Sequence, residues 1–238
     1  MTTKLSININ KIATLRNARG GNMPNVVHFA KDCERFGVDG ITVHPRPDER
    51  HITTQDVFDL AEIVTTEFNI EGYPDERFME IIRKIKPAQA TLVPDPPDVI
   101  TSNTGWDVKN NLSYLQNIIS EIQSLGVRVS IFLNADIDQV IAAKESGTDR
   151  IEFYTGPYAD NFHTDKNVAI KNYVSAAQKT FDLKLGINAG HDLNLDNLKF
   201  FKQSVIHLDE VSIGHALISD ALYFGIENTI QLYKRQLS

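Results

Sequence analysis

The sequence predicts a (β/α)8 barrel, a single-domain TIM barrel with extra helices that spans residues 1–238. Eight short β-rich runs alternate with longer amphipathic segments, which is the element order of an α/β protein. Several of these runs end in a side chain suited to proton or phosphate chemistry. Barrel enzymes gather such side chains at the C-terminal ends of their strands, and the length suits one barrel of about 250 residues.

The eight predicted strands are continuous apolar runs, without alternation of polar and apolar residues. Continuous runs are typical of parallel strands that are covered on both faces. The runs lie at residues 5–9, 40–44, 68–73, 90–94, 127–133, 150–155, 184–190 and 210–215.

The segments between the strands carry helix signals. Thr53 and Asp56 stand at capping-box spacing before an apolar face, so a helix is expected over 53–68. Glycine is favoured just after a helix, and Gly37, Gly126 and Gly147 fit that position. Further helices are expected over 24–37, 75–86, 107–126 and 136–147, and the two long connections 16–24 and 156–166 are expected to be rim loops.

A doubly wound open sheet has the same order of elements as a barrel. It gathers its site at one switch point, whereas candidate functional residues here follow strands at both ends and in the middle of the chain. Neither the G-x-G-x-x-G nor the G-x-x-x-x-G-K-[ST] nucleotide motif follows any strand. The closed barrel is therefore favoured.

Composition and charge disfavour several classes of protein. An apolar fraction of 42% is too high for a disordered chain, and a net charge of −7 opposes non-specific binding to nucleic acid. Cys33 is the only cysteine and is expected to be buried in a helix. No secretory signal is visible, and no apolar run approaches the ~20 residues of a membrane span. We expect a cytoplasmic protein with neither membrane nor nucleic acid as a partner.

The first candidate site residues follow the second predicted strand in TVHPRPDERH. Arg46 is expected to keep the nearby His44 imidazole neutral and therefore basic near pH 7. His51, at the mouth of the next helix, is expected to bind a substrate phosphate together with Arg46. The alternative is a set of exposed side chains in a charged loop.

Two glutamates are candidates for acid–base roles. Glu71 lies between Ile70 and Gly72 at the end of a strand, and an apolar setting raises the pKa of a carboxyl group toward neutrality. Glu152 lies inside a strand, two residues after Arg150. It either forms an ion pair inside the barrel or orients a group in the active site.

The last two predicted strands end in the Gly-His pairs of NAGHD and SIGHA. Backbone amides at the start of a helix bind anions, and barrels often hold phosphate after their last two strands. These two ends are therefore a candidate phosphate site with His191 and His215 beside it. Arg16 and Arg19, in the loop expected after the first strand, are candidates for further phosphate contacts.

A metal site formed by His44, His191 and His215 is disfavoured, because neither H-x-H nor H-E-x-x-H occurs in the sequence.

Taken together, these segments resemble the pyridoxine 5′-phosphate synthase family. The resemblance covers about residues 5–235 and is carried by NINKIATLRNARG, GVDGITVHPRPDERHI, FNIEGY, TLVPD, IEFYTGPYAD, INAGHDL and SIGHALI. It implies a (β/α)8 barrel that assembles as a homo-octamer and needs neither a metal nor an organic cofactor. It also implies condensation of 1-deoxy-D-xylulose 5-phosphate with 3-amino-2-oxopropyl phosphate, which forms pyridoxine 5′-phosphate and releases phosphate and water.

The family's functional residues carry over where its motifs match this sequence. His44 and Glu71 match the general bases, His191 the proton donor, and Glu152 a residue that stabilises a charged intermediate. The loop near 95–106 is expected to cover the site. The positions that hold the aminoketone phosphate match Asn8, Arg19, Gly214 and His215, and those that hold the sugar phosphate match Arg46, His51 and Thr101.

The sequence departs from the family pattern at two places. The family's opening motif N-I-D-H is N-I-N-K here, so Asn10 and Lys11 take the positions that contact the sugar substrate. An amide still bonds a hydroxyl, and a lysine still supplies a cation. Asp192 stands where the family has glycine after the last catalytic histidine, and its backbone amide can bind phosphate if its carboxylate turns away.

Two other interpretations stay open. A different phosphosugar barrel, such as an isomerase or an aldolase, is the alternative enzyme. A Schiff-base aldolase needs a lysine at the active rim, whereas Lys184 opens a strand and is expected at the other rim. A ligand-binding or scaffold barrel without activity is the alternative to an enzyme, and the presence of His44, Glu71 and His191 argues against it.

Overall fold

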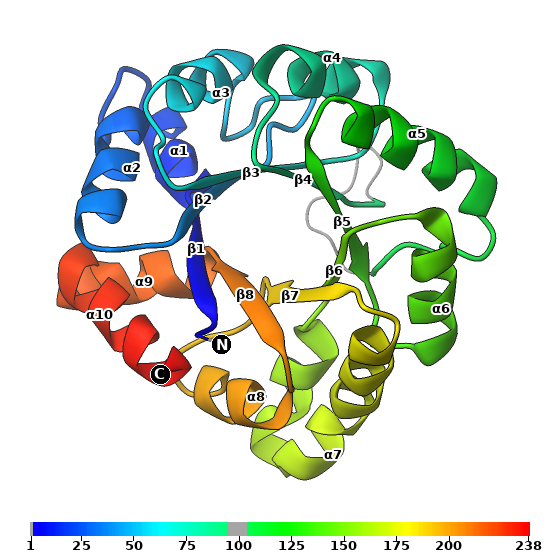
Figure 1. Cartoon of the computed structure of the whole chain (residues 1–238). Coiled ribbons are helices and arrows are strands. Elements are labelled where there is room, and N and C mark those ends of the chain that lie inside the picture. The colour runs from blue at the N-terminus through cyan, green and yellow to red at the C-terminus, as the bar shows by residue number, and fades with distance from the viewer. Residues whose placement is uncertain (1, 95–103) are drawn as a thin grey trace.

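Eight parallel strands close into a barrel that is surrounded by helices, as the sequence predicts (Figure 1). The computed structural model describes residues 2–94 and 104–238. The strands follow one another around the barrel in sequence order, from β1 to β8, and β8 pairs with β1. Successive parallel strands need a crossover connection, and helices on the outside of the barrel supply it.

The strands agree with the predicted runs to within one or two residues at their ends. They are β1 (Lys4–Asn8), β2 (Gly40–Val43), β3 (Glu67–Gly72), β4 (Gln89–Leu92), β5 (Arg128–Leu133), β6 (Arg150–Phe153), β7 (Gly186–Gly190) and β8 (Leu208–Ile213).

Each segment predicted to be helical contains a helix, although the ends differ from the predicted ones. Thr53 and Asp56 form the predicted capping box of α3, although this helix ends at Ala61. Gly37, Gly126 and Gly147 follow helices with φ of 92°, 81° and 86°. The helices are α1 (Asn10–Asn17), α2 (Val26–Arg35), α3 (Thr54–Ala61), α4 (Glu76–Ile85), α5 (Leu112–Ser124), α6 (Ile137–Ser146), α7 (Gly156–Asp182), α8 (Leu198–Ser204), α9 (His215–Phe224) and α10 (Ile226–Leu237).

One of the two segments predicted as rim loops is helical. Residues 156–166 form the start of α7, with a kink at Asp165, where φ is −156° and ψ is 97°, so the loop predicted there is wrong. The loop predicted over 16–24 is confirmed from residue 18 onward, because α1 ends at Asn17. Helix α1 itself was not predicted, and its inner face buries Ile12, Ala13 and Arg16.

The inside of the barrel is polar, which the continuous apolar runs did not lead us to expect. The Ser6 and Thr42 hydroxyls lie 2.8 Å apart, and Asn69 accepts a hydrogen bond from Thr91 at 3.0 Å. Leu5 and Ile7, on the other face of β1, are fully buried in the apolar core. The strands therefore alternate, with hydrogen-bonded polar side chains inside and apolar side chains toward the helices.

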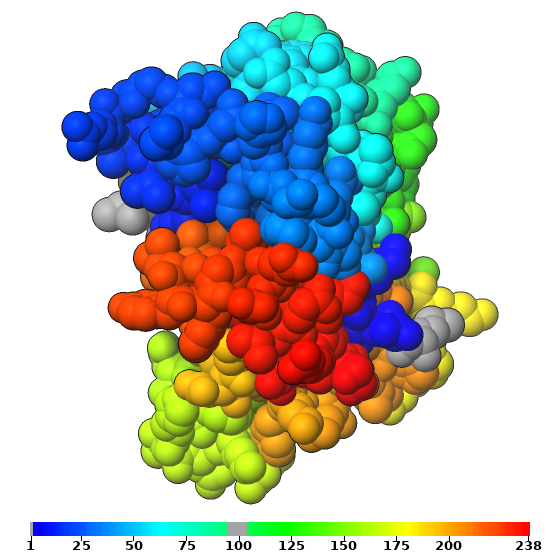
Figure 2. Space-filling view, turned by 90° about the vertical axis from the view of Figure 1, so that its left-hand side faces the viewer, coloured from blue at the N-terminus to red at the C-terminus, as the bar shows by residue number. Residues whose placement is uncertain are grey.

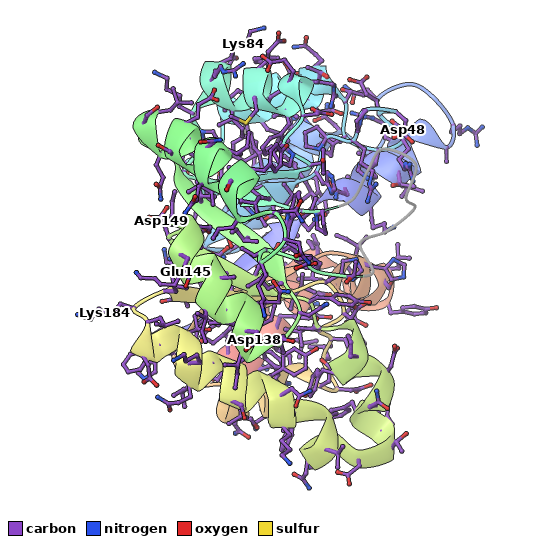
Figure 3. The ribbon with its side chains drawn as sticks, turned by 90° about the vertical axis from the view of Figure 1, so that its right-hand side faces the viewer. Asp48, Lys84, Asp138, Glu145, Asp149 and Lys184 are labelled. Atoms are coloured by element: carbon purple, nitrogen blue, oxygen red, sulfur yellow. The ribbon has the colours of Figure 1, made fainter. Side chains whose placement is uncertain are left out.

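The two rims of the barrel lie at opposite ends of the molecule. Asp48, which follows β2, lies at one end in Figure 3, and Lys184 and Asp149, which precede β7 and β6, lie at the other. The expectation that Lys184 lies away from the C-terminal rim is confirmed. Cys33 is buried in α2, as expected. Within the described ranges, no helix is both long and apolar enough to cross a bilayer.

Candidate active site

A cavity of about 800 Å³ opens where the C-terminal ends of the strands meet. Its wall is drawn from segments that follow strands throughout the sequence, from β1 to β8. The structure thus brings together side chains that are about two hundred residues apart in the chain, such as Asn8 and His215. The predicted site residues that line the cavity are Asn8, Asn10, Lys11, His44, Arg46, His51, Glu71, Glu152, His191, Asp192, Gly214 and His215.

Two predicted residues that the structure describes, Arg19 and Arg16, do not line this cavity, and a third lies outside the described residues. Arg19 is exposed in the loop after α1. Thr101 and most of the loop expected to cover the site, near 95–106, lie outside the described residues. Arg16 was a candidate for phosphate contact, and this prediction was wrong: its guanidinium is buried against Asp56, with Nη1 2.5 Å from Oδ1.

His44 is a buried, neutral imidazole at the end of β2. Burial lowers its pKa well below the ordinary value, and the nearby Arg46 lowers it further. The His44 backbone N–H donates to Asn10 Oδ1 at 3.0 Å, which fixes the start of α1 to the end of β2. The predicted effect of Arg46 on His44 is confirmed in its direction, with burial as the larger cause.

His51 is also held neutral. Burial and the charge of Arg46 lower its pKa to about 4. Its Nδ1 accepts a hydrogen bond from the Ile52 backbone N–H at 2.9 Å. The neutral ring therefore carries its proton on Nε2, where it can donate to an anionic ligand.

Glu71 at the end of β3 is oriented by an asparagine from β1. Asn8 Nδ2 donates to Glu71 Oε2 at 3.2 Å, and Asn8 Oδ1 accepts from the Asn10 backbone N–H at 3.1 Å. The second hydrogen bond fixes which side of the amide faces Glu71. Asn8 was predicted to contact a phosphate, and the structure adds this contact with Glu71.

Glu152 is a buried carboxyl group, and no Lys or Arg among the described residues forms an ion pair with it. Burial raises its pKa well above the ordinary value, and the charge of Glu71 adds to the shift. Its Oε2 has no hydrogen-bond partner among the described residues. The alternative of an ion pair inside the barrel finds no partner among the described residues, because the candidate from the sequence, the Arg150 guanidinium, donates to Asn188 at 3.0 Å and lies 3.6 Å from Glu210. A protonated Glu152 is available to donate a hydrogen bond into the cavity.

His191 and Asp192 form a side-chain contact that was not predicted from the sequence. His191 Nδ1 lies 2.8 Å from Asp192 Oδ2, and His191 has a left-handed backbone with φ of 51°. The Asp192 backbone N–H, which was considered for phosphate binding, donates to the Gly190 carbonyl at 2.8 Å. The Asp192 carboxylate thus turns toward the imidazole at Nδ1.

Gly214 and His215 lie at the junction of β8 and α9, as predicted. Gly214 precedes the first turn of the helix, where backbone N–H groups are unpaired within the helix and favour an anion. A Cβ atom at Gly214 would lie 3.0 Å from the Asn8 backbone oxygen and 3.1 Å from Asn8 Cβ. Within residues 2–94 and 104–238, no three His, Cys, Asp or Glu side chains are grouped to hold a metal.

The cavity wall contains residues that the sequence did not single out. Arg50 and Phe132 are two of them. Arg50 belongs to the charged segment PRPDERH, so its charge was a visible signal. Phe132 lies in β5 and gave no signal, because an aromatic residue in a strand is most often part of a core. The others are Thr14, Val93, Ala159, Asn194, Ser212 and Ala216.

Residues 5–238 match the family described as "Pyridoxal phosphate biosynthesis protein PdxJ". This chain belongs to the PdxJ family. It is 59% identical over 236 residues to the pyridoxine 5′-phosphate synthase of Porphyromonas gingivalis, with 99% of each chain covered. It is also 59% identical over 235 residues to the enzyme of that name from Cytophaga hutchinsonii, again with 99% of each covered.

A more distant likeness supports the fold alone. The solved structure of 3-keto-L-gulonate-6-phosphate decarboxylase from Vibrio cholerae aligns with this PdxJ-family chain at a TM-score of 0.66 and 9% identity. The alignment covers 100% of this chain and 98% of the other.

Proposed function

We propose that this PdxJ-family protein is a pyridoxine 5′-phosphate synthase. It condenses 3-amino-2-oxopropyl phosphate with 1-deoxy-D-xylulose 5-phosphate and releases pyridoxine 5′-phosphate, inorganic phosphate and water. The observation that carries the proposal is one cavity of about 800 Å³ lined by a neutral His44, by Glu71 and Glu152, and by His191. The names of its relatives support the same activity.

The first steps form an imine between the two substrates. The amine of the aminoketone adds to the ketone of the sugar phosphate, and the adduct loses water. His44 is neutral at pH 7 and accepts a proton, and Glu71, held by Asn8, serves as the second base. Enclosure in a cavity orients the two reactants and raises their effective concentration.

His191 donates a proton to the phosphate that leaves. The Asp192 carboxylate on Nδ1 stabilises the imidazolium, the form that can release a proton from Nε2. A protonated Glu152 stabilises negative charge that develops during the elimination by donating a hydrogen bond. Addition of a carbon nucleophile to the remaining carbonyl then closes the ring, and loss of water makes it aromatic.

Two groups of residues hold the substrates. For the aminoketone phosphate, the N-terminus of α9 at Gly214 and His215 supplies backbone amides, with Asn8 and Arg19 as predicted contacts. For the sugar phosphate, the predicted contacts are Arg46, His51, Asn10, Lys11 and Thr101. Asp192 is a further predicted substrate contact, in addition to its contact with the His191 imidazole. These steps are acid–base steps, so the proposal includes no metal and no organic cofactor.

We also infer that the protein acts as a homo-oligomer, with the octamer as the expected state, in the cytoplasm. Support for self-association comes from three consecutive apolar residues at the end of α9. Leu222, Tyr223 and Phe224 are 76%, 86% and 49% exposed. Helix α9, in orange, lies on the face shown in Figure 2 and reaches its left-hand edge.

Release of inorganic phosphate from the two substrates, with no metal, nucleotide or cofactor added, tests the function. We expect the wild-type protein to form phosphate and pyridoxine 5′-phosphate in equal amounts. Glu71→Gln should reduce turnover by about 100-fold or more, because an amide accepts no proton at pH 7. Glu80→Gln, on the outer helix α4, is the matched control. Near-normal turnover by Glu71→Gln would contradict the base role, and an inactive wild type would contradict the function.

A further inference from the structure

The segment between β2 and α3, residues 44–53, supplies more of the cavity wall than its length suggests. His44, Arg46, Arg50 and His51 all line the cavity. This segment, here called the β2–α3 loop, contains neither a helix nor a strand. The loop has a few hydrogen bonds of its own, such as the one from the Glu49 N–H to the Arg46 carbonyl at 3.0 Å, and contacts from outside the loop add to them.

Arg16 holds one end of the β2–α3 loop from helix α1. Its two terminal nitrogens donate to the Asp56 carboxylate at 2.5 and 2.8 Å, and Nη2 also lies 3.3 Å from the His51 carbonyl oxygen. The neighbouring Asn17 donates to the same carbonyl at 2.8 Å. Because Asp56 also caps α3 by accepting from the Thr53 backbone N–H at 2.8 Å, this contact joins α1, the loop and α3.

Arg77 holds the other end from helix α4. Its Nη1 donates to the Pro45 carbonyl oxygen at 2.8 Å, and its Nη2 donates to Thr54 Oγ1 at 2.8 Å. The same Nη2 lies 3.3 Å from Glu49, whose carboxylate also accepts from the Thr54 backbone N–H at 2.9 Å. Helices α1, α3 and α4 follow one another around this part of the barrel (Figure 1).

We propose that Arg16 and Arg77 are positioning residues that fix the β2–α3 loop in its substrate-binding form. Neither arginine lines the main cavity. They act on the backbone next to the ligands: Arg77 bonds the carbonyl just before Arg46, and Arg16 bonds the carbonyl of His51 itself. Holding the backbone of His51 also keeps its ring nitrogen Nδ1 on the Ile52 N–H and directs Nε2–H toward a ligand.

One contact favours a positioning role over simple reinforcement of the fold. Arg16 is a buried cation whose Nη2 donates to a loop carbonyl as well as to Asp56. A loop ordered before binding loses less conformational entropy when the ligand arrives. A loosened loop should therefore weaken binding of the phosphate it contacts while leaving chemistry at Glu71 and His191 nearly unchanged. This inference rests on the proposed function, which assigns Arg46 and His51 to the sugar phosphate.

Steady-state kinetics with each substrate varied in turn tests the proposal. Arg16→Lys keeps a cation but loses the two-nitrogen contact with Asp56, so we expect the KM for 1-deoxy-D-xylulose 5-phosphate to rise about tenfold. The KM for the aminoketone and kcat should change less than about twofold. Asn17→Ala and Arg77→Lys, which alter less buried side chains, should raise the same KM by a smaller factor.

Arg83→Lys is the matched control, because Arg83 lies on α4 in exposed pairs with Glu76 and Glu121 and does not contact the loop. It should leave both KM values unchanged. If the folded variants at Arg16, Asn17 and Arg77 keep the wild-type KM for the sugar phosphate, or raise both KM values equally, the positioning role is wrong. If wild type itself forms no product, the proposed function has failed instead.

Discussion

At the residue scale, the cavity is notable for imidazoles that are kept uncharged. His44 and His51 both lose solvent and both face Arg46, and each cause disfavours the protonated ring. A neutral His51 can still bind phosphate through Nε2–H, while Arg46 supplies the charge. This division of roles lets His44 remain a base at a pH where an exposed histidine is partly protonated.

The shifted pKa of His51 predicts a loss of stability on the acid side. The pKa of an unfolded histidine is about 6.5, whereas that of folded His51 is about 4. As pH falls below 6.5, the unfolded chain takes up a proton that the folded chain does not, so the His51 contribution is present above pH 6.5 and is lost toward pH 4. Between pH 7 and pH 5 this amounts to about 2 kcal/mol.

Urea denaturation at both pH values checks this prediction. The His51→Gln variant should lose about 2 kcal/mol less free energy of unfolding than wild type between pH 7 and pH 5. His28→Gln, at an exposed position on α2, is the control and should follow wild type. Equal pH dependence of wild type and His51→Gln would contradict the assignment.

The sequence predicted the position of some site residues in the cavity and not of others. His44, Glu71 and His191 were predictable because a polar side chain at the tip of an apolar run has little structural use. Arg16 was not, because its partner Asp56 lies forty residues away and no local pattern joins them. The contact of Asp192 with His191 depends on a left-handed backbone at His191, which sequence does not reveal.

At the element scale, hydrophobic spacing predicted the strands and most helices, and it failed where helices are short or polar. Helix α1 has only two apolar residues on its buried face, and its third buried residue is Arg16. The polar interior of the barrel was missed for a related reason. Its serine, threonine and asparagine side chains are small and are interleaved with outward-facing Ile, Leu and Val, so each strand looks apolar throughout.

At the end of β7, we predict that Gly190 cannot be replaced by a residue with a side chain. A Cβ atom at Gly190 would lie 2.2 Å from the Ser212 backbone oxygen in β8, the same oxygen that accepts from the His191 N–H at 3.2 Å. Gly190→Ala should therefore separate the two strand ends, cost about 1–3 kcal/mol of stability and displace His191. We expect turnover to fall at least tenfold.

Gly126→Ala separates the stability effect of Gly190→Ala from its catalytic effect. Gly126 lies at the opposite rim, its φ is 81°, and no atom lies near a Cβ built there. Its alanine variant should lose about 1 kcal/mol through backbone strain and keep wild-type turnover. Denaturation and turnover assays on both variants give the comparison. A Gly190→Ala enzyme with normal turnover would show that His191 does not depend on this close contact.

At the scale of the whole molecule, the barrel lets a chain with net charge −7 bind anionic substrates. The overall field repels phosphate, so binding must come from local groups. Closure of the sheet brings Arg46 and Lys11 from one part of the chain and the α9 N-terminus from another around one cavity. Predicting that closure needed the order of elements together with candidate functional residues after strands throughout the chain, whereas the sequence did not predict the shape of the cavity.

The exposed apolar residues at the end of α9 predict that two copies of the protein associate through this end of the helix. Leu222 and Tyr223 are among the most exposed large apolar residues in the described ranges, and an apolar surface of this kind is stabilised when a second copy covers it. Tyr223→Glu should place a charge in that contact, so light scattering at fixed concentration should give a smaller assembly than wild type with unchanged far-UV circular dichroism. Val168→Glu, at another exposed apolar position on α7, should leave the mass unchanged. If wild type is a monomer, there is no subunit contact. If Tyr223→Glu keeps the mass of the wild-type assembly, the subunit contact lies elsewhere.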